Sequence, residues 1–277
     1  MKVKNLSDNV IVAIDVGTTK ICVLVAQVSQ TGNIEIIAIG KSPSQGLAKG
    51  VIVNVAQAVE SIKSAVKEAE FMMGKQIESA YVGISGSHIQ AINSHGIVPI
   101  KNKQITVYDI AAAINSAKAV PIAEGHKLLH VIPQYYIIDG QHKVHDPLGM
   151  HGVRLEVQVH MITGAIPSIQ NLIRCCEMAG VKVEDIILEQ IASAQSVLSE
   201  DERQIGVAIL DIGGGTSDFA IYQQDSVMHT KVIPIAGNLF TNDIAACLRT
   251  TIKSAEQAKK LLADRSLDDT ITLEMIQ

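Results

Sequence analysis

The 277-residue sequence predicts a layered α/β fold. Short runs rich in Val and Ile alternate along the chain with longer segments of helical periodicity. Many of these short runs are apolar throughout, which is typical of strands that are covered on both faces. A strand–turn–strand unit also occurs twice, which predicts two related halves.

Composition limits the class of protein. Apolar residues make up 47% of the chain and charged residues 18%, so aliphatic burial can offset the loss of chain entropy and general disorder is excluded. The net charge of −5 argues against nucleic acid as a partner. The four cysteines form no CxxC pair, and the apolar run at 10–14 is too short for a signal peptide or a membrane span. We therefore expect a reduced, cytoplasmic protein without a transmembrane segment.

The apolar runs predict the strands in chain order. We expect them at 10–14, 21–28, 34–39, 80–84, 131–138, 155–162, 183–188, 205–210, 217–222 and 227–233.

Capping residues and apolar stripes predict the helices. Asn54 can cap a helix that Gly74 ends, and Thr106 with Asp109 resembles a capping box for a helix that ends before Pro121. Pro167 suits the first turn of a helix that ends at Gly180. Two more helices are expected near 189–198 and 254–263. Cys175 and Cys176 fall in the helix after Pro167, where inert core positions are expected.

The repeated unit is the most informative feature of the sequence. Residues 13–19 and 209–215 superpose at an offset of 196, which aligns Asp15 with Asp211. In both copies an apolar strand is followed by Asp, one apolar residue and Gly, which begin a tight turn, and a second strand follows the turn. Backbone N–H groups and hydroxyls around a carboxylate suit phosphate and Mg²⁺. A single copy is more often an ordinary turn, whereas two copies favour a phosphate site.

Other sites are not supported by their spacing. The chain has neither a GxxxxGK[ST] loop nor a GxGxxG turn, which excludes P-loop and Rossmann dinucleotide sites. Residues 83–86 lack the GxSxG spacing of a nucleophile elbow and are interpreted as a loop. The histidines and aspartate at 142, 145, 146 and 151 lie among Gly and Pro, where a loop is favoured over a zinc site.

The two turns, at 15–19 and 210–222, resemble the phosphate hairpins of the actin and Hsp70 ATPase superfamily. Residues 189–194 resemble its first connecting helix, with Gln190 at the position where that superfamily usually has Pro. Further segments resemble the FtsA family of bacterial cell-division proteins. They are 86–89, 129–134, 146–150, 154–156, 159–164 and 237–244.

The resemblance implies an actin-like, duplicated ribonuclease H-like ATPase fold with an FtsA-type inserted small domain and an incomplete second half. It divides the chain into a first half at 1–86 and 164–199, the inserted domain at 87–163, the start of the second half at 200–236, and part of a second insertion at 237–277. FtsA-like proteins continue beyond this point with an adenine-binding turn and a basic amphipathic helix that lies on the membrane. We therefore expect a shortened product without that helix.

The resemblance also implies roles for individual residues. Asp15 and Asp211 would hold Mg²⁺ through water, and Glu189 would align the attacking water; these three are the catalytic candidates. The candidate contacts to ATP are Gly17, Thr18, Thr19, Lys20, Gly213, Gly214, Gly215, Thr216, Gly237, Asn238, Glu256 and Lys259. Alternatives stay open at three places: Lys20 as an exposed strand-edge lysine, Glu189 as a carboxylate at a helix start, and Glu256 with Lys259 as a surface ion pair.

By the same resemblance, the function is that of an ATP-binding scaffold for the division septum, at most a slow Mg-dependent ATPase. The implied partners are the tubulin-like protein FtsZ, other division proteins and further copies in a filament, at the inner face of the cell membrane. Two alternatives stay open: a PilM-type adaptor of pilus assembly and a sugar kinase of the same fold.

Overall fold

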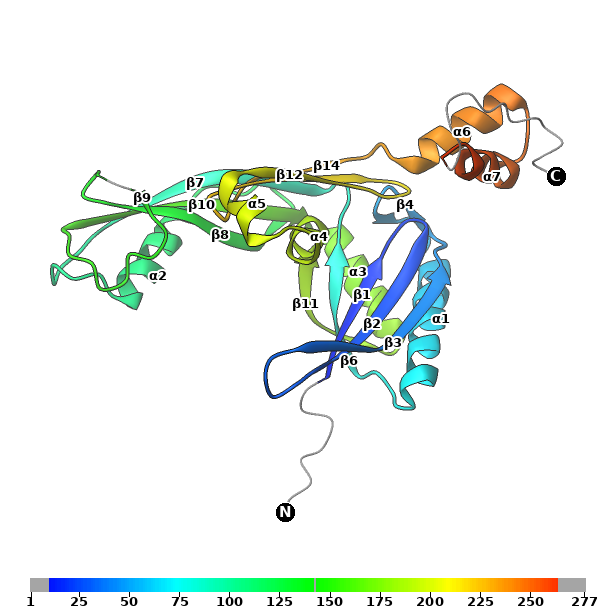
Figure 1. Ribbon diagram of the computed structural model, residues 1–277, viewed down its shortest axis with the longest axis horizontal. Coiled ribbons are helices and arrows are strands. Elements are labelled where there is room, and N and C mark those ends of the chain that lie inside the picture. The colour runs from blue at the N-terminus through cyan, green and yellow to red at the C-terminus, as the bar shows by residue number, and fades with distance from the viewer. Residues whose placement is uncertain (1–9, 142, 264–277) are drawn as a thin grey trace, which may run out of the picture.

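Figure 1 shows the computed structural model of the chain, which describes residues 10–141 and 143–263. The first half is a five-stranded sheet. In spatial order its strands are β11 (Lys182–Leu188), β6 (Ser79–Ile84), β1 (Val10–Val16), β2 (Lys20–Val28) and β3 (Ile34–Pro43). Strands β1, β2 and β3 form an antiparallel meander, whereas β6 and β11 run parallel to β1.

Two helices, α1 (Val55–Met73) and α3 (Ile166–Met178), cover one face of this sheet (Figure 1). The Asn54 side chain caps α1 by accepting the Gln57 N–H at 3.2 Å, and Gly74 ends it with a φ of 72°. Gly40 on β3 allows a close approach, because a Cβ there would lie 1.9 Å from the Ala65 carbonyl oxygen of α1. The first half therefore has a tightly packed aliphatic core on this side.

The inserted domain is an antiparallel sheet with the order β7 (Ile89–Pro99), β10 (Arg154–Ala165), β8 (His126–Ile138) and β9 (Lys143–Val144). Helix α2 (Val107–Ala117) packs on it and begins with the expected capping box of Thr106 and Asp109. Alternate residues of β10, among them Leu155, Val157 and Val159, are fully buried beneath it. The inserted domain therefore has a hydrophobic core of its own, distinct from that of the first half.

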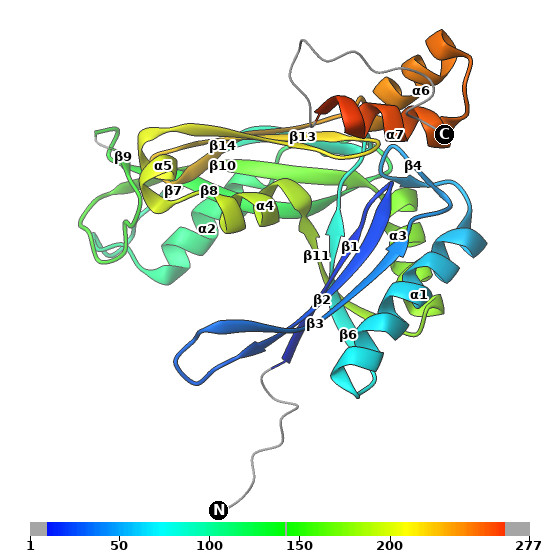
Figure 2. The same ribbon diagram turned by 45° about the vertical axis from the view of Figure 1, so that its right-hand side comes forward.

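Helices α4 (Glu189–Val197) and α5 (Glu200–Ile205) lead from the first half into the second. The antiparallel strands β12 (Val207–Ile212), β13 (Ser217–Gln223) and β14 (Ser226–Ile233) follow. Figure 2 shows this sheet lying along the sheet of the inserted domain. Side chains of the inserted domain bond to β14: the Gln134 amide donates to the Val227 carbonyl at 2.7 Å, and His160 Nε2 lies 2.9 Å from Thr230 Oγ1. Burial lowers the pKa of His160 to about 4, so this contact involves the neutral imidazole.

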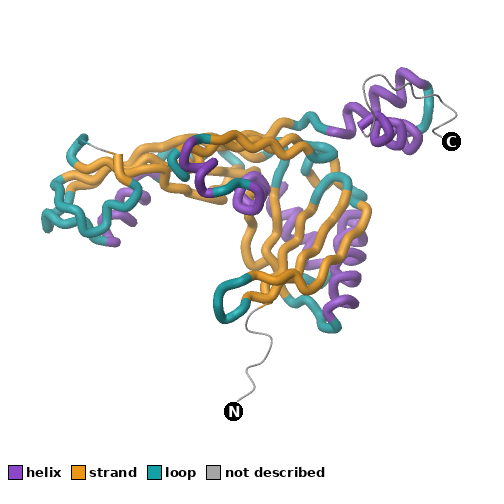
Figure 3. The backbone as a smooth tube through the Cα atoms, viewed as in Figure 1, coloured by secondary structure: helices purple, strands orange, loops and turns teal. Residues whose placement is uncertain are grey.

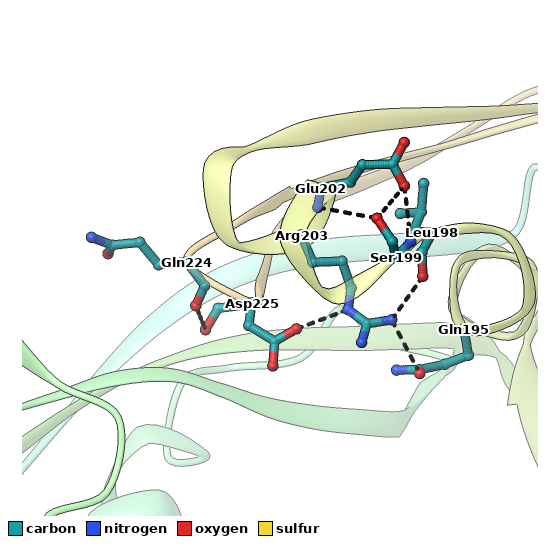
Figure 4. Close-up of polar contacts among 8 residues, drawn as sticks. Gln195, Leu198, Ser199, Glu202, Arg203, Gln224 and Asp225 are labelled. Atoms are coloured by element: carbon teal, nitrogen blue, oxygen red, sulfur yellow. Dashed lines mark hydrogen bonds and ion pairs between the residues drawn. The ribbon is translucent and has the colours of Figure 1, made fainter.

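Arg203 ties α4, α5 and the β13–β14 turn together (Figure 4). Its Nε donates to Asp225 Oδ1 at 2.8 Å and its Nη1 to the Leu198 carbonyl at 3.3 Å. Gln224 and Asp225 both have positive φ, 51° and 57°, as a two-residue hairpin turn requires. The start of the second half is thereby fixed against the helix that precedes it.

The short strands β4 (Leu47–Ala48) and β5 (Val51–Ile52) pair with each other near the phosphate-type turns. Helices α6 (Gly237–Leu248) and α7 (Ile252–Ala263) pack together beyond the end of β14, as the tube in Figure 3 shows. No helix within residues 10–141 and 143–263 is long and apolar enough to cross a membrane.

Most of the expected elements are present, with some corrections. The strand expected at 205–210 begins at Val207, because Ile205 ends helix α5. Strands β4, β5, β7 and β9 and helices α5 and α6 were not expected. Cys175 and Cys176 are fully buried as predicted, and burial raises the pKa of the Cys176 thiol to about 12, which makes it inert. His142 and residues 264–277 lie outside the described residues, and the domain boundaries stay a prediction.

Candidate functional site

The two repeated turns have the same backbone geometry. Gly17 N–H donates to the Lys20 carbonyl at 3.1 Å, and Gly213 N–H donates to the Thr216 carbonyl at 2.9 Å. The strand registers also repeat, since Asp15 pairs with Cys22 across β1 and β2 as Asp211 pairs with Asp218 across β12 and β13. The repeat found in the sequence is thus a repeat in the structure.

The turns lie against each other. A Cβ built on Gly214 would lie 1.9 Å from Thr19 Oγ1, and one on Gly215 would lie 2.7 Å from Thr18 Oγ1. Thr18 Oγ1 in turn accepts the Gly50 N–H at 3.2 Å. Only residues without a side chain fit on the second turn at this distance. The glycines therefore let two turns from separate halves meet.

A cavity of about 720 Å³ opens between the two halves beside these turns, within the size range of ligand pockets. It brings together most of the predicted site residues: Asp15, Gly17, Thr18, Thr19, Lys20, Glu189, Asp211, Gly213, Gly214 and Thr216. One wall is the sheet face that α1 and α3 leave open, where Leu24 and Tyr81 contribute apolar surface. The cavity therefore combines a polar end at the turns with an apolar wall.

Glu189 is the first residue of α4 and projects over Gly83 of β6, where a Cβ would lie 3.2 Å from its Cγ. The backbone is held at the preceding residue, because the Leu188 N–H donates to His130 Nε2 at 3.1 Å. Burial raises the pKa of Glu189 well above its usual value, and the carboxylates of Asp15, Asp218 and Asp211 raise it further. Glu189 thus holds its proton unusually strongly.

Asp15 and Asp211 face the cavity from opposite halves. Burial raises the pKa of Asp15, the nearby Lys20 ammonium lowers it, and Asp211 raises it. Asp211 Oδ2 accepts the Ser193 hydroxyl at 2.9 Å. Lys20 therefore interacts electrostatically with a site carboxylate, although it stands at a strand end.

Asp218 was not expected in the site. It is 5% exposed, lines the cavity, and its Oδ1 accepts the Ser85 hydroxyl and the Gln190 amide, each at 2.5 Å. The repeat gave no signal for it, because the first copy has Cys22 at the equivalent position. Of residues 83–86, which were interpreted as a loop, Gly83 and Ile84 lie in β6, within the strand predicted at 80–84, whereas Ser85 and Gly86 follow its end. Gly83 lies under Glu189, and Ser85 donates to Asp218.

The donor set of the cavity is made of carboxylate and hydroxyl oxygens with one lysine, which suits a hard cation such as Mg²⁺. Within the described part of the chain no three His, Cys, Asp or Glu side chains are grouped for direct metal ligation. Carboxylates that bond to the waters of a hydrated cation fit this arrangement. His145, Asp146 and His151 form no such group within the described residues either.

Five predicted contacts lie beside the cavity but are not among the residues that line it: Gly215, Gly237, Asn238, Glu256 and Lys259. The N–H groups of Gly237 and Asn238 donate to the carbonyls of Gly213 and Gly214 at 3.0 and 2.8 Å. These two residues begin helix α6, where a turn was expected.

Lys259 Nζ lies 2.7 Å from Glu256 Oε2 and 3.1 Å from the Gly237 carbonyl. Glu256 Oε2 also accepts the Thr241 hydroxyl at 2.6 Å. These bonds hold α7 against the beginning of α6, and α6 buttresses the second turn.

Comparison with known proteins connects this geometry to a family. The model of the SHS2 domain inserted in FTSA matches residues 86–163, and the model of cell division protein FtsA matches residues 208–276. FtsA of Pseudomonas aeruginosa is 49% identical over 91% of this chain, and FtsA of Escherichia coli K12 is 40% identical over 93%. This chain belongs to the FtsA family. It spans about three fifths of the length of these relatives, 61% of each.

Solved structures show the fold. The PilM–PilN type IV pilus biogenesis complex matches with a TM-score of 0.68 at 15% identity, covering 91% of this chain and 69% of that one. The ethanolamine utilization protein EutJ of Carboxydothermus hydrogenoformans matches with a TM-score of 0.52 at 14% identity, covering 91% and 61%. The predicted actin-like α/β fold with an FtsA-type inserted domain is confirmed. The likeness to PilM is one of fold alone, whereas the relatives above 40% identity are division proteins.

Proposed function

We propose that this FtsA-family chain binds ATP with Mg²⁺ in the cavity between its halves and serves as a nucleotide-dependent scaffold of cell division. One observation carries the proposal. Two turns that are closed by equivalent Gly N–H to carbonyl hydrogen bonds, 196 residues apart in the sequence, meet at one end of a cavity of about 720 Å³, with Asp15 and Asp211 on opposite sides. Turns of this kind offer convergent backbone N–H groups to phosphate oxygens.

Residues of the two turns would bind the phosphate end of the nucleotide. Backbone N–H groups of Thr18, Thr19 and Gly214, with the hydroxyls of Thr18 and Thr19, would bind the phosphates. The Gly17 and Gly213 N–H groups close the two turns and so hold these donors in place. Lys20, Gly215 and Thr216 would complete the phosphate end. Bound Mg²⁺ supplies positive charge that offsets the phosphate and carboxylate charges.

The carboxylates would act around that cation. Asp15 and Asp211 would hold its waters, and Glu189 would align the attacking water. Because Glu189 holds its proton strongly, it is a poor base in the empty site, which fits hydrolysis that is at most slow.

Residues on α6 and α7 would serve the adenosine end. Gly237, Asn238, Glu256 and Lys259 adjoin the second turn through the bonds from α6 to Gly213 and Gly214. We propose that Glu256 and Lys259 contact the ribose, exchanging part of their bonding to each other and to Thr241 for the ligand.

Calorimetric titration of Mg-ATP into the chain tests the proposal, with Asp211→Asn as the site variant. Asp243→Asn is the matched control, because Asp243 is an exposed aspartate of the same half, on α6. We expect saturable binding by the wild type and the control, and at least about tenfold weaker binding by Asp211→Asn, since charged contacts of this kind contribute about 1.5–3 kcal/mol. Equal affinity for all three proteins would contradict the proposal.

The family also suggests partners and a location. We propose FtsZ, other division proteins and further copies of this chain as partners, at the septum on the inner face of the cell membrane. The matches to division proteins at 40–49% identity support this proposal. Co-sedimentation with FtsZ filaments, and imaging of a fluorescent fusion in dividing cells, test it. Failure to co-sediment together with a uniform distribution in the cell would count against it.

A further inference from the structure

The inserted domain is bonded to the half of the molecule into which it is not inserted. It leaves the first half after β6 and returns to it at α3, so both of its covalent connections run to the first half. Its sheet nevertheless lies along the sheet of the second half (Figure 2). Three of its strands each contribute one side chain to β14: Asn93 on β7, Gln134 on β8 and His160 on β10. The inserted domain therefore bridges the two halves.

A β-bulge in β14 provides an acceptor for two of these side chains. The register shifts between Ile221 and Tyr222 of β13, and both pair with other positions of β14, so Met228 is the extra residue of the bulge. A backbone carbonyl that leaves the ladder needs another partner. The Met228 carbonyl accepts the side-chain amides of Asn93 and Gln134, each at 3.2 Å. The bulge thus turns the backbone of β14 toward the inserted domain.

The same contacts fix the hydrogen-bonding state of His160. Because Asn93 Nδ2 donates to a carbonyl, Asn93 Oδ1 is the atom that faces His160 Nδ1, at 2.6 Å. His160 Nδ1 then carries the proton, and His160 Nε2 accepts the Thr230 hydroxyl at 2.9 Å. Burial and the neighbouring His229 both lower the pKa of His160, which keeps the ring neutral. The ring therefore connects β7 of the inserted domain to β14.

This contact is buried but mostly polar. His160, Gln134 and Thr230 are only 1%, 2% and 3% exposed. Ile132 supplies the apolar part from the inserted domain, where it packs against a small cluster on α4, β13 and β14. Each neutral hydrogen bond contributes little net free energy, and polar interfaces between domains permit relative movement. The contact can therefore hold the domain in one orientation and still open.

We propose that these side chains form a latch, which fastens the inserted domain to the second half so that the two move together. The members of the latch are Asn93, Gln134, His160 and Thr230. The first connection to the first half passes through Gly86, whose φ of 141° only glycine adopts readily. One consequence rests on the proposed function: a shift of the second half on binding Mg-ATP would also turn the inserted domain relative to the first half.

Solvent exchange of the Gln134 side-chain amide hydrogens measures opening of the latch, because this amide is buried and bonded to β14. NMR of protein labelled with ¹⁵N-glutamine follows this exchange without nucleotide. Thr230→Val removes the hydroxyl that His160 accepts and leaves both bonds of the Gln134 amide in place. We expect Gln134 exchange to become about 2- to 10-fold faster in Thr230→Val, since one hydrogen bond of a common latch is lost.

Thr163→Val is the matched control. Thr163 is a buried threonine of β10 whose hydroxyl donates within the inserted domain, to the Gln90 carbonyl at 3.4 Å. Gln134 exchange in Thr163→Val should equal that of the wild type. The backbone amides of β1 and β2 report unfolding of the first half, and their exchange should be the same in all three proteins.

Pairs of spin labels on α1, α2 and β13 test whether the inserted domain follows the second half. Lys67, Ala112 and Gln223 are exposed positions on these elements. The background carries Cys22→Ala and Cys247→Ser, so that the accessible native cysteines take no label. On addition of Mg-ATP, the distances from α1 to α2 and from α1 to β13 should change together, whereas the distance from α2 to β13 should stay the same.

Each alternative outcome overturns a stated part. Gln134 exchange that is unchanged in Thr230→Val, or equally faster in Thr163→Val, overturns the latch. A change in the distance from α1 to β13 without one from α1 to α2 overturns the joint movement. Mg-ATP binding by the labelled protein in calorimetry without any distance change overturns the link to the nucleotide. Absence of Mg-ATP binding by the wild type overturns the proposed function itself, and the exchange of Gln134 still decides whether the latch exists.

Discussion

The contact between the two turns makes a specific prediction for Gly215→Ala. The added Cβ would lie 2.7 Å from Thr18 Oγ1 and 3.0 Å from both the N and the Cα of Lys49. Carbon atoms in ordinary contact are about 3.5–4.0 Å apart, so the second turn must retreat by roughly 0.5 Å. Thr18 cannot rotate away without losing its bond from the Gly50 N–H. Overpacking of this kind costs about 1–3 kcal/mol.

That cost falls on the arrangement in which both turns reach one nucleotide, so Mg-ATP affinity should fall about 5- to 150-fold. Calorimetric titration measures it, and the thermal melt of the free protein shows whether the fold is retained. Gly149→Ala is the control, because Gly149 lies in the inserted domain away from the cavity lining and its added Cβ would meet nothing within 4 Å. Wild-type affinity in Gly215→Ala, or an equal loss in Gly149→Ala, would refute the reasoning.

Three further predictions concern stability. The raised pKa of Glu189 means that its contribution to stability is complete below the unfolded pKa and is lost as the pH rises through the folded pKa. Glu189→Gln should remove this loss and be more stable than the wild type near neutral pH, by about 1.4 kcal/mol for each pH unit between the unfolded and the folded pKa of Glu189. Urea unfolding of both proteins over roughly pH 4–8 measures the difference. Stability that depends on pH in the same way in both proteins would contradict the prediction. Gln224→Gly should raise the melting temperature and stabilise the fold by about 0.5 kcal/mol, because Gln224 is exposed and its φ of 51° is strained for a residue with a Cβ. A lower melting temperature would contradict the prediction. Gly40→Ala should cost about 3 kcal/mol in urea unfolding, because its Cβ would lie 1.9 Å from the Ala65 carbonyl oxygen; a loss below about 1 kcal/mol would show that α1 can move away from β3.

The sequence predicted the centre of the site well, and the reason is physical. Asp15 and Asp211 lie near the ends of apolar strands, of which β1 is largely buried and β12 is largely exposed. The apolar residues and the turn glycines are local signals, so each turn can be predicted without tertiary information. The duplication then predicted that the two turns are related, and the structure brings them into contact. Long periodic elements such as α1, with its Asn54 and Gly74 caps, were predicted for the same reason.

Elements that depend on distant partners were not predicted. Strand β7 contains Asn93, His95 and Gly96 and has no clear periodicity, and it becomes a strand by pairing with β10 along its whole length. Helix α6 begins with Gly237 and Asn238, two typical turn residues, whose N–H groups bond to carbonyls of the second turn.

The support of Asp218 was missed because it is assembled from three separate segments. Ser85, Gln190 and Asp218 lie far apart in sequence and form no spacing motif. Their hydrogen bonds exist only once α4 is packed between the first sheet and β13. Side-chain networks of this kind are set by tertiary packing, which no local pattern records.

Hydrogen exchange with and without saturating Mg-ATP tests the central claim, that both turns hold one nucleotide, most directly. The amides of 17–19 and 213–215 are the reporters, and those of the β13–β14 turn at Gln224 and Asp225, remote from the cavity, are the internal control. We predict slower exchange in both turns together and no change at the control. Protection of one turn alone, or of neither, would contradict it.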